Sequence, residues 1–599
     1  MEQAHQRPAA TAADLARVYA EVANKSSRLL TQFLEREPND VPVPFRDQLG
    51  VSKAFFEAWS RMLTDPVRLA EAQVKLWQDY MALWQTTMLK AWGHETAPVA
   101  SPPEGDRRFR HEDWEQSFLH DYIKQSYLIA AKHLHQTLAN VKGLDEKTAK
   151  KVDFYTRQYI DALSPSNFLF TNPEALRETV ASGGQNLLKG LNNLLEDLAR
   201  GNGSELRLKM TDTKAFRLGE NIAVTPGKVV FQNDLLQLIQ YAPRTEKVYA
   251  RPLLIIPPWI NKYYILDLRE KNSFVRWAVE QGHTVFVISW VNPDERLAHK
   301  TFDDYLVEGA LAALKAVERA TGQADANVIG YCLGGTLLAC ALAWLAAKNE
   351  NRVHSATFFV SMIDFRDPGE LGIFIDEEQL KALESRMAKR GYLEGSEMAT
   401  TFNMLRANDL IWSFVVNNYL LGKDPFPFDL LYWNSDSTRM PAAMHSFYLR
   451  NMYMKNLLCK PGGIKLAGVP IDVTRIRIPA YFVSTVEDHI APWKSTYAGA
   501  RLMKGPVRFV LGGSGHIAGI INPPGANKYC YWTNDALPEN PDEWLETATQ
   551  HPGSWWADWG SWIAARGGDM VSARIPGKGK LKSIEEAPGS YARMRADEK

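Results

Sequence analysis

The sequence predicts an α/β protein whose sheet-forming region is preceded by a region of helices alone. From residue 205 onward, short apolar runs such as Leu253–Ile256 and Thr284–Trp290 alternate with helical patterns, which is typical of a mostly parallel sheet covered on both faces. Residues 1–204 show helical periodicity only. Over residues 365–470 the alternation stops, so this segment is predicted to be a largely helical insertion.

The first 93 residues form one helical region in this prediction. Its last helix is expected to begin at Pro66, because proline directly after Thr64 and Asp65 suits a first helical turn. Helical spacing then gives one apolar face, which comprises Trp77, Tyr80, Met81, Trp84 and Met88. Packing against the rest of the protein is the simpler interpretation of this face. Docking to a partner or to a hydrophobic particle is the alternative.

A Pro-rich linker, residues 94–108, separates this region from a second helical part, residues 109–204. His133 and His135 lie in the second part, and their spacing raises the question of a metal-ligand pair. Two residues that are two positions apart on a helix point to different faces. We therefore predict surface histidines here, and we expect no metal site.

The α/β region is predicted in two parts that flank the insertion. Residues 205–364 form the first part, in which Val229–Phe231 and Leu235–Tyr241 make a hairpin ahead of the alternating strands. The insertion at 365–470 falls between the sixth and seventh strands and is expected to form a cap. Residues 471–565 complete the sheet. The tail, residues 566–599, is rich in Gly, Lys and Arg and is expected to be loosely ordered.

The composition excludes several classes of protein. Lys and Arg number 69 and so do Asp and Glu, which gives no electrostatic attraction to nucleic acid. The four cysteines include no CxxC pair, so a reducing, cytoplasmic setting fits best. No stretch reaches the ~18 consecutive apolar residues of a membrane span. A GxGxxG after a strand and a GxxxxGKS/T loop are both absent, so we expect no nicotinamide or nucleotide cofactor.

One short segment carries the strongest chemical signal. Gly330-Tyr331-Cys332-Leu333-Gly334 follows an apolar run and precedes an apolar helical pattern. This is the strand–turn–helix pattern G-x-S-x-G of a nucleophile elbow, with cysteine in place of serine. The helix N-terminus behind Cys332 favours negative charge on its sulfur. The alternative is a glycine-rich turn around a buried cysteine, since free cysteine often serves as a small core residue.

Two further residues decide between these interpretations. Asp488 lies just beyond the strand Ala480–Ser484, and His516 lies in a glycine-rich loop just beyond the strand Val507–Leu511. The chain order of nucleophile, acid and histidine is that of the α/β hydrolases, whose sites form at the carboxyl ends of the strands. A loop histidine and a helix-capping aspartate would explain each residue alone. The ordered set of three predicts an α/β-hydrolase core with a helical cap insertion.

The chemistry assigns a role to each member of this triad. His516 would remove the proton from the Cys332 thiol, and the thiolate would act as the nucleophile. Asp488 would orient the imidazole and stabilise its cationic form. His489 is the competing histidine. Because adjacent residues point apart, we expect it to line the mouth of the site rather than to share the triad.

An oxyanion intermediate also requires two backbone N–H donors. One should come from Leu333, directly after the nucleophile, and the other from the loop after Leu253–Ile256. Pro257 and Pro258 have no N–H, so Trp259 or Ile260 is the candidate.

Beyond these motifs, the chain resembles the class I polyhydroxyalkanoate synthases over most of residues 105–565. The blocks that carry the resemblance are Pro257–Asp267, Gly282–Phe286, Gly330–Gly335, Phe428–Asn434, Glu487–Ile490 and Gly515–Pro524. The resemblance implies that Cys332, Asp488 and His516 are catalytic, and that Asp488 is also a candidate for activating a substrate hydroxyl. It places Arg406 near the path of coenzyme A.

The same resemblance implies a substrate and partners. The substrate would be a short-chain (R)-3-hydroxyacyl-coenzyme A, and the products would be polyester and free coenzyme A. The protein would be a cytoplasmic homodimer attached to the growing polyester granule. It would have no nucleic-acid partner and no membrane span.

Two other functions compete with this one. A thioesterase, esterase or polyester depolymerase on the same scaffold would use the same triad, although the cysteine and the large cap argue against it. A non-catalytic scaffold that coats granules through amphipathic helices would leave the ordered triad without a purpose.

Overall fold

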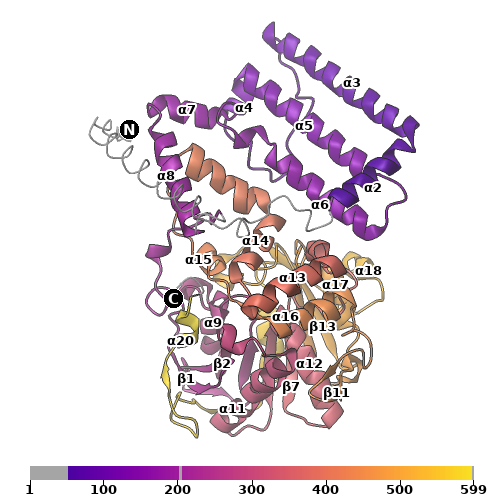
Figure 1. Cartoon of the computed structure of the whole chain (residues 1–599). Helices are drawn as coiled ribbons and strands as arrows, with labels where there is room; N and C mark the ends of the chain where they lie inside the picture. Colours follow the sequence, from indigo (N-terminus) through magenta and orange to yellow (C-terminus); the bar gives the residue numbers. More distant parts are fainter. Residues whose placement is uncertain (1–50, 202–205, 596–599) are drawn as a thin grey trace. The chain divides into compact units, whose positions relative to one another are not determined.

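The computed structural model describes residues 51–201 and 206–595, and it divides into two compact units. The first comprises the chain up to Asp212 together with Phe402–Phe426, and the second comprises Thr213–Thr401 and Pro427–Lys599 (Figure 1). The part of the helical prediction that falls on residues 1–50 lies outside the described residues. Among the described residues, no helix combines the length and the apolar character needed to cross a membrane.

The first unit is helical, as its periodicity indicates. Its α-helices are α2 (Val51–Leu63), α3 (Pro66–Ala91), α4 (Asp113–Gln116), α5 (Phe118–Ala139), α6 (Glu146–Ala162), α7 (Pro173–Ala181) and α8 (Gln185–Arg200). Helix α3 begins as predicted, because the Asp65 side chain accepts a hydrogen bond from the Arg68 N–H and Pro66 needs no acceptor. Residues 94–108 contain no helix.

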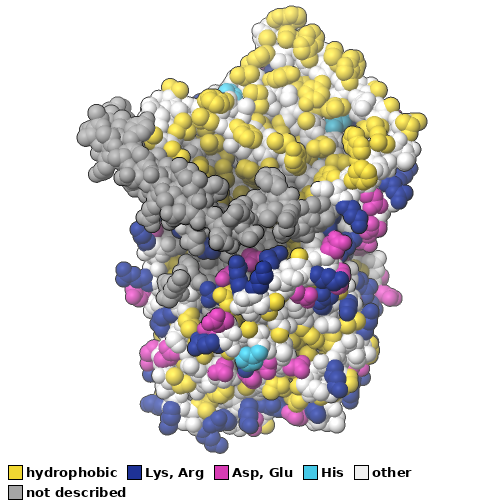
Figure 2. Space-filling view, viewed as in Figure 1, with side chains coloured by type: hydrophobic (Ala, Val, Ile, Leu, Met, Phe, Trp, Pro, Cys, Tyr) yellow, Lys and Arg dark blue, Asp and Glu magenta, His cyan; other side chains and the backbone are white. Residues whose placement is uncertain are grey.

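The apolar stripe of α3 is not one packed face. Tyr80 faces α5, where its hydroxyl donates to the Ser126 carbonyl at 3.1 Å. Trp77 and Trp84, by contrast, are 64% and 53% exposed. Figure 2 shows hydrophobic side chains crowded over the part of the molecule that Figure 1 labels α2 and α3. The interpretation that this face packs against the rest of the protein is therefore wrong for Trp77 and Trp84, which form part of an exposed apolar surface.

The two histidines of α5 occupy different environments. His135 is partly exposed and pairs with Asp153 of α6 at 2.8 Å. His133 is buried and pairs with Asp79 of α3 at 2.8 Å. The prediction of different faces is correct, but the prediction that both lie at the surface is wrong for His133. A carboxylate on the packed face of α3 makes burial of this histidine possible.

Part of the predicted cap belongs to the first unit. The π-helical turns Asn408–Trp412 and Val415–Leu420 lie in its segment Phe402–Phe426, and the second turn packs on α8. The Tyr419 hydroxyl donates to Asp197 at 2.7 Å. A Cβ on Gly190 would overlap the Tyr419 backbone, so a glycine is required where α8 passes. Residues 365–470 are therefore not a single insertion domain, and the boundary expected at 204/205 falls at 212/213.

The second unit is built on one sheet with strand order β15-β14-β13-β12-β7-β6-β4-β5-β2-β1-β17 in the described part of the chain. The pairs from β13 to β5 are parallel, and the outer pairs are antiparallel. The strands are β1 (Gly227–Gln232), β2 (Leu236–Tyr241), β4 (Leu253–Ile256), β5 (Val285–Trp290), β6 (Ala326–Tyr331), β7 (Val353–Phe359), β12 (Ala480–Thr485), β13 (Val507–Gly512), β14 (Cys530–Thr533), β15 (Thr549–Pro552) and β17 (Glu585–Glu586).

The remaining elements of the second unit are short strand pairs and helices. The pairs are β16 (Met570–Ser572) with β3 (Lys247–Tyr249), β10 (Lys465–Leu466) with β11 (Val469–Pro470), and β8 (Tyr392–Leu393) with β9 (Met440–Pro441). The helices are α9 (Phe274–Glu280), α10 (Phe302–Asp304), α11 (Ala312–Thr321), α12 (Leu333–Lys348), α13 (Glu377–Arg390), α15 (Asp429–Ser435), α16 (Ala442–Tyr448), α17 (Trp493–Ala500), α18 (Pro541–Glu546), α19 (Trp556–Ala564) and α20 (Ser590–Arg593). Helix α14 (Gly395–Leu405) spans the boundary between the units.

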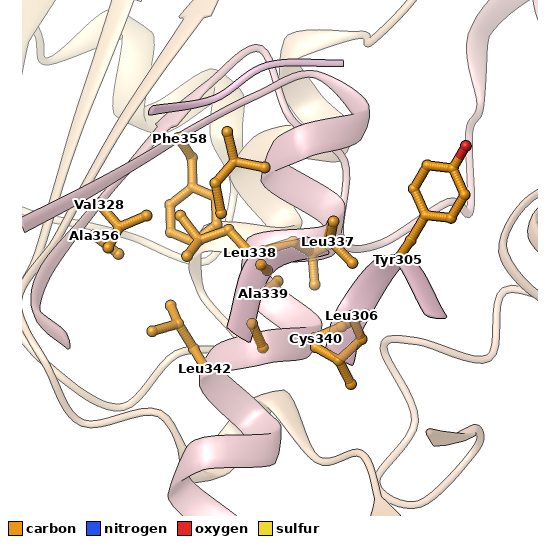
Figure 3. Close-up of a cluster of buried hydrophobic side chains, with 14 of the residues drawn as sticks. Tyr305, Leu306, Val328, Leu337, Leu338, Ala339, Cys340, Leu342, Ala356 and Phe358 are labelled. Carbon is orange, nitrogen blue, oxygen red and sulfur yellow. The ribbon is translucent and has the colours of Figure 1, made fainter. Parts of the chain in front are cut away.

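Two hydrophobic clusters cover the two faces of the sheet. In β4, Leu254 and Ile256 belong to one cluster and Leu253 and Ile255 to the other, as alternation along a strand requires. Helix α12 packs in the first cluster, where Figure 3 shows Cys340 among neighbouring apolar side chains. The sheet is thus buried on both faces, which explains why its central strands are continuously apolar.

The C-terminal tail is ordered over its described residues, contrary to expectation. Strand β17 pairs with β1 in antiparallel fashion, and β16 pairs with β3. The Tyr591 hydroxyl donates to the Asn233 carbonyl at 2.7 Å. The composition of the tail predicted a loosely ordered segment. The tail is nevertheless ordered because it pairs as edge strands through its backbone, which does not require an apolar sequence.

Candidate active site

Strand β6 ends at Tyr331, and helix α12 begins at Leu333, so Cys332 forms the turn between them. Its backbone has φ 51° and ψ −117°, a region that residues with a side chain rarely adopt. The Cys332 N–H donates to the Phe359 carbonyl of β7 at 2.9 Å, and the Cys332 carbonyl accepts from Gly335 and Thr336. The turn is fixed on both sides and has the geometry of a nucleophile elbow.

Close packing explains the glycines of this elbow. A Cβ on Gly334 would overlap the backbone carbonyls of Ile256 and Pro257, and a Cβ on Gly330 would overlap Gly335. Glycine is needed at both positions because strand, helix and neighbouring loop approach one another at backbone distance. The loop after β4 is thereby held beside the start of α12.

The structure brings His516 and Asp488 together beyond the ends of β13 and β12. Nδ1 of His516 lies 2.7 Å from Oδ2 of Asp488. The other carboxylate oxygen, Oδ1, accepts hydrogen bonds from the N–H groups of Ile490 at 2.9 Å and Ala491 at 2.8 Å. The Asp488 side chain is 0% exposed and that of His516 is 7% exposed. Each oxygen of the carboxylate therefore has a protein partner.

The charges around His516 favour its cationic form. Burial lowers the pKa of His516, but the negative charges of Asp488, which is hydrogen-bonded to the ring, and of Cys332 outweigh burial and raise that pKa to about 10. The ring of Tyr331 stacks against the imidazole with centroids 6.1 Å apart. The structure thus joins His516 to Asp488, and the participation of Cys332 in a triad with them stays a prediction.

Three backbone N–H groups are the candidates for binding an oxyanion. The first belongs to Leu333, which opens α12 and therefore has no acceptor within the helix. The other two belong to Trp259 and Ile260 in the loop after β4, and neither donates to another group among the described residues. The Trp259 ring itself is buried against Tyr305 and Tyr448. The use of these N–H groups as oxyanion donors stays a prediction.

A cap residue that the sequence analysis missed lies close to the triad. Burial, together with the negative charges of Cys332 and Asp488, raises the pKa of Tyr453. Tyr453 belongs to the π-helical turn Leu449–Met454 that follows α16. No sequence signal singles it out, because it is one of several aromatic residues in the cap.

The aromatic residues of the predicted cap lie in different environments. Tyr432 and Trp433 are buried in the core, and the Trp433 indole donates to the Lys262 carbonyl at 2.7 Å. Phe426 is 79% exposed and belongs to the first unit. The sequence could not separate these cases, because all of them lie in one aromatic-rich stretch.

His489 and Arg406, the two predicted substrate-binding residues, lie in different parts of the chain. His489 is half-buried, and the Asp488 carboxylate contacts His516. Arg406 lies in the first unit, where it pairs with the neighbouring Asp409 at 3.3 Å. A role for either residue in substrate binding stays a prediction.

The second unit has the α/β-hydrolase fold, and residues 253–523 match the family described as the alpha/beta hydrolase fold. A solved hydrolase from Pseudomonas aeruginosa aligns with 49% of this chain and 92% of its own, at 14% identity and a TM-score of 0.30.

A second match specifies the family more closely. Residues 105–278 match the family described as the N-terminus of poly-beta-hydroxybutyrate polymerase (PhaC). The poly(3-hydroxyalkanoate) polymerase of Methylorubrum extorquens is 51% identical over 541 residues, which cover 90% of this chain and 89% of that protein. The PhaC subunit of Rhizobium meliloti is 49% identical over 590 residues, which cover 98% and 96%. The chain belongs to the poly(3-hydroxyalkanoate) polymerase family.

Proposed function

We propose that this enzyme polymerises short-chain (R)-3-hydroxyacyl-coenzyme A into polyester and releases coenzyme A through an acyl-cysteine on Cys332. Family membership supports the reaction, since the relatives at 51% and 49% identity are named poly(3-hydroxyalkanoate) polymerases. The observation that supports the mechanism is the hydrogen bond between His516 and Asp488, together with the position of Cys332 in the strand–helix turn and the influence of its charge on His516.

In the first half-reaction, the Cys332 thiolate attacks the thioester carbonyl of the substrate. The proton that the thiol gave up resides on His516, whose raised pKa suits this cationic state. The oxyanion is stabilised by N–H groups of Leu333 and of Trp259 or Ile260. Coenzyme A then leaves as its thiol, taking that proton. One thioester replaces another, so this transfer is nearly isoenergetic.

In the second half-reaction, the hydroxyl of another acyl unit attacks the acyl-cysteine. His516 takes the hydroxyl proton, an ester forms, and Cys332 leaves as a thiolate. We assign the activation of this hydroxyl to His516 rather than to Asp488. The reason is access, because both oxygens of Asp488 have protein partners and its side chain is 0% exposed. Asp488 then orients the imidazole and stabilises its charge.

We further propose a cytoplasmic enzyme that acts as a homodimer on the surface of the polyester granule. The exposed apolar side chains of α2 and α3 support attachment to such a surface (Figure 2). They include Phe56 at 72%, Trp59 at 56%, Val67 at 68%, Trp77 at 64% and Trp84 at 53% exposure. Exposed apolar patches of this kind commonly mark interaction sites. Arg406 remains our candidate for a contact with coenzyme A.

A mass balance tests the proposed function. The enzyme is incubated with 3-hydroxybutyryl-coenzyme A, and released thiol is compared with soluble 3-hydroxybutyrate and with chloroform-extractable polymer. We expect polymer to account for most of the released thiol. If soluble acid accounts for nearly all of it at every substrate concentration, the enzyme is a thioesterase. If no thiol is released while the protein still binds polyester, the scaffold function takes its place.

A further inference from the structure

The loop from Trp259 to Lys262, which carries two of the proposed oxyanion donors, is fastened by the cap on one side. The Thr438 N–H donates to the Ile260 carbonyl at 3.1 Å, and the Thr438 hydroxyl donates to the Trp259 carbonyl. The Trp433 indole donates to the Lys262 carbonyl at 2.7 Å. The cap therefore holds this loop through its carbonyl groups, which leaves the N–H groups of Trp259 and Ile260 unused within the described chain.

The same loop is fastened on another side by the end of the chain. Nζ of Lys262 donates to the carbonyl of Met594 at 2.6 Å and to that of Tyr591 at 3.0 Å. Tyr591 belongs to α20 and Met594 is its C-cap, so these carbonyls are among those that a helix end leaves without intrahelical partners. A cation at this position also interacts favourably with the negative end of the helix.

The contact between Lys262 and the tail carbonyls is buried, so the ammonium group depends on these acceptors. Lys262 is 3% exposed, and burial lowers its pKa to about 8 although the charge of Asp436 opposes the shift. A buried ammonium is tolerated only where hydrogen-bond acceptors compensate for lost water. If the two tail carbonyls moved away, Lys262 would have to seek water, and the loop that contains it would move.

The tail, in turn, is anchored independently of the loop. The Tyr591 N–H donates to the Gln237 side chain at 3.1 Å, and the Tyr591 hydroxyl donates to the Asn233 carbonyl at 2.7 Å. Both acceptors lie at the β1–β2 hairpin, a rigid part of the sheet. The sheet thus fixes the tail, and the tail fixes the loop through Lys262.

We propose that Lys262 is a positioning residue for acyl transfer, which fastens the loop Trp259–Asn261 to the C-terminal segment Ser590–Met594 and so aims the oxyanion donors at the reacting carbonyl. The inference rests on the proposed function, because it requires the oxyanion that forms when Cys332 attacks a thioester. It gives the C-terminal segment a part in catalysis although that segment contributes no side chain to the triad.

Two reactions of Cys332 separate this role from general support of the fold. Alkylation by iodoacetamide is a displacement that forms no oxyanion, so its rate reports only on Cys332 and His516. Acylation by 3-hydroxybutyryl-coenzyme A forms an oxyanion, so its single-turnover rate also reports on the donors. We expect Lys262→Met to slow acylation by about 10- to 100-fold, less than the 10²–10³ typical of removing a donor outright. Alkylation should stay within about twofold of wild type.

Three further full-length variants complete the test. Lys262→Arg keeps a cation and should restore part of the acylation rate. Lys228→Met removes a surface ion pair with Glu586 of the same tail, 2.6 Å long, and should leave both rates unchanged. Tyr591→Ala loosens the tail from the sheet and should reproduce the selective loss of acylation. If Lys262→Met fails to fold, Tyr591→Ala tests the positioning role in its place.

Several results would overturn the inference. If Lys262→Met is acylated at the wild-type rate, the contact between Lys262 and the tail is not needed for acyl transfer. If Lys262→Met does not fold, a wild-type acylation rate in Tyr591→Ala leads to the same conclusion. Equal losses of acylation and alkylation would reduce Lys262 to a residue that merely supports the site. A wild-type enzyme that is alkylated at Cys332 but never acylated would instead refute the proposed function itself, and this outcome is visible before any variant is measured.

Discussion

His516 and Asp488 are joined at 2.7 Å while the Asp488 side chain is fully shielded from solvent. Because both carboxylate oxygens have protein partners, we infer that Asp488 acts on the reaction through the imidazole. This relationship separates the two roles that the sequence left open for Asp488, and it leads to the first experiment.

Replacing Asp488 with asparagine should impair both half-reactions together. Loss of the charge leaves the imidazolium without its partner, and a comparable change in a serine-protease triad costs about 10⁴ in turnover. The measurements are single-turnover release of coenzyme A and steady-state polymer formation. A variant that released one equivalent of coenzyme A normally but could not elongate would contradict the orienting role and favour Asp488 as the base for the hydroxyl.

Substitution of Cys332 by alanine should abolish release of coenzyme A, with a loss on the order of 10⁴ or more. Cys340 provides the matched control eight residues further along α12. It is buried in the first hydrophobic cluster, where burial raises the pKa of its thiol (Figure 3). Cys340→Ala should keep near-normal turnover. The elbow assignment fails if the two variants behave the other way round.

The histidines at 516 and 489 should differ in their effect on the nucleophile. His516 hydrogen bonds to Asp488, and its pKa responds to the charges of both Asp488 and Cys332. Alkylation of Cys332 by iodoacetamide should therefore slow sharply in His516→Gln and only mildly in His489→Gln. The rates are followed by mass spectrometry of the labelled peptide. Equal slowing in both variants would leave the base unassigned.

Stability should depend on pH through His516. Its pKa is raised from 6.5 to about 10 in the folded protein, so the folded state holds this proton more tightly than the unfolded state. The stabilisation is complete below pH 6.5 and is lost as pH rises toward 10. Its size is on the order of 5 kcal/mol at most. Chemical unfolding at several pH values should show a smaller decline across this window in His516→Gln than in His489→Gln. Parallel declines would argue against the charge pairing.

The sequence predicted the α/β core well because its signals are local. The apolar runs of β4 and β6, the glycines around Cys332 and the strand-end positions of Asp488 and His516 all follow from short stretches of chain. The Pro257-Pro258 pair similarly restricted the second oxyanion donor to Trp259 or Ile260, since proline has no N–H to give.

The features that the sequence predicted wrongly or did not reveal depend on contacts between residues that are distant in sequence. Phe402–Phe426 joins the helical unit because α8 offers it a glycine and hydrogen-bonding groups, about which the segment itself says nothing. His133 is buried because Asp79 meets it from another helix. Lys262 stands in an apolar stretch between Ile260 and Ile265, which is an unusual setting for a lysine. That contrast was the one signal that could have revealed its buried contact with the tail.

Strand β17 gives the sheet a protected border. An outermost strand normally exposes a row of unpaired backbone groups that can recruit the strand of a neighbouring molecule. Here the border is two residues long and consists of Glu585 and Glu586, so it is too short and too acidic to be extended. Removing it would uncover β1 (Gly227–Gln232), whose central residues Val229–Phe231 are apolar. A chain shortened before residue 585 should therefore self-associate, even where the triad and the core are intact.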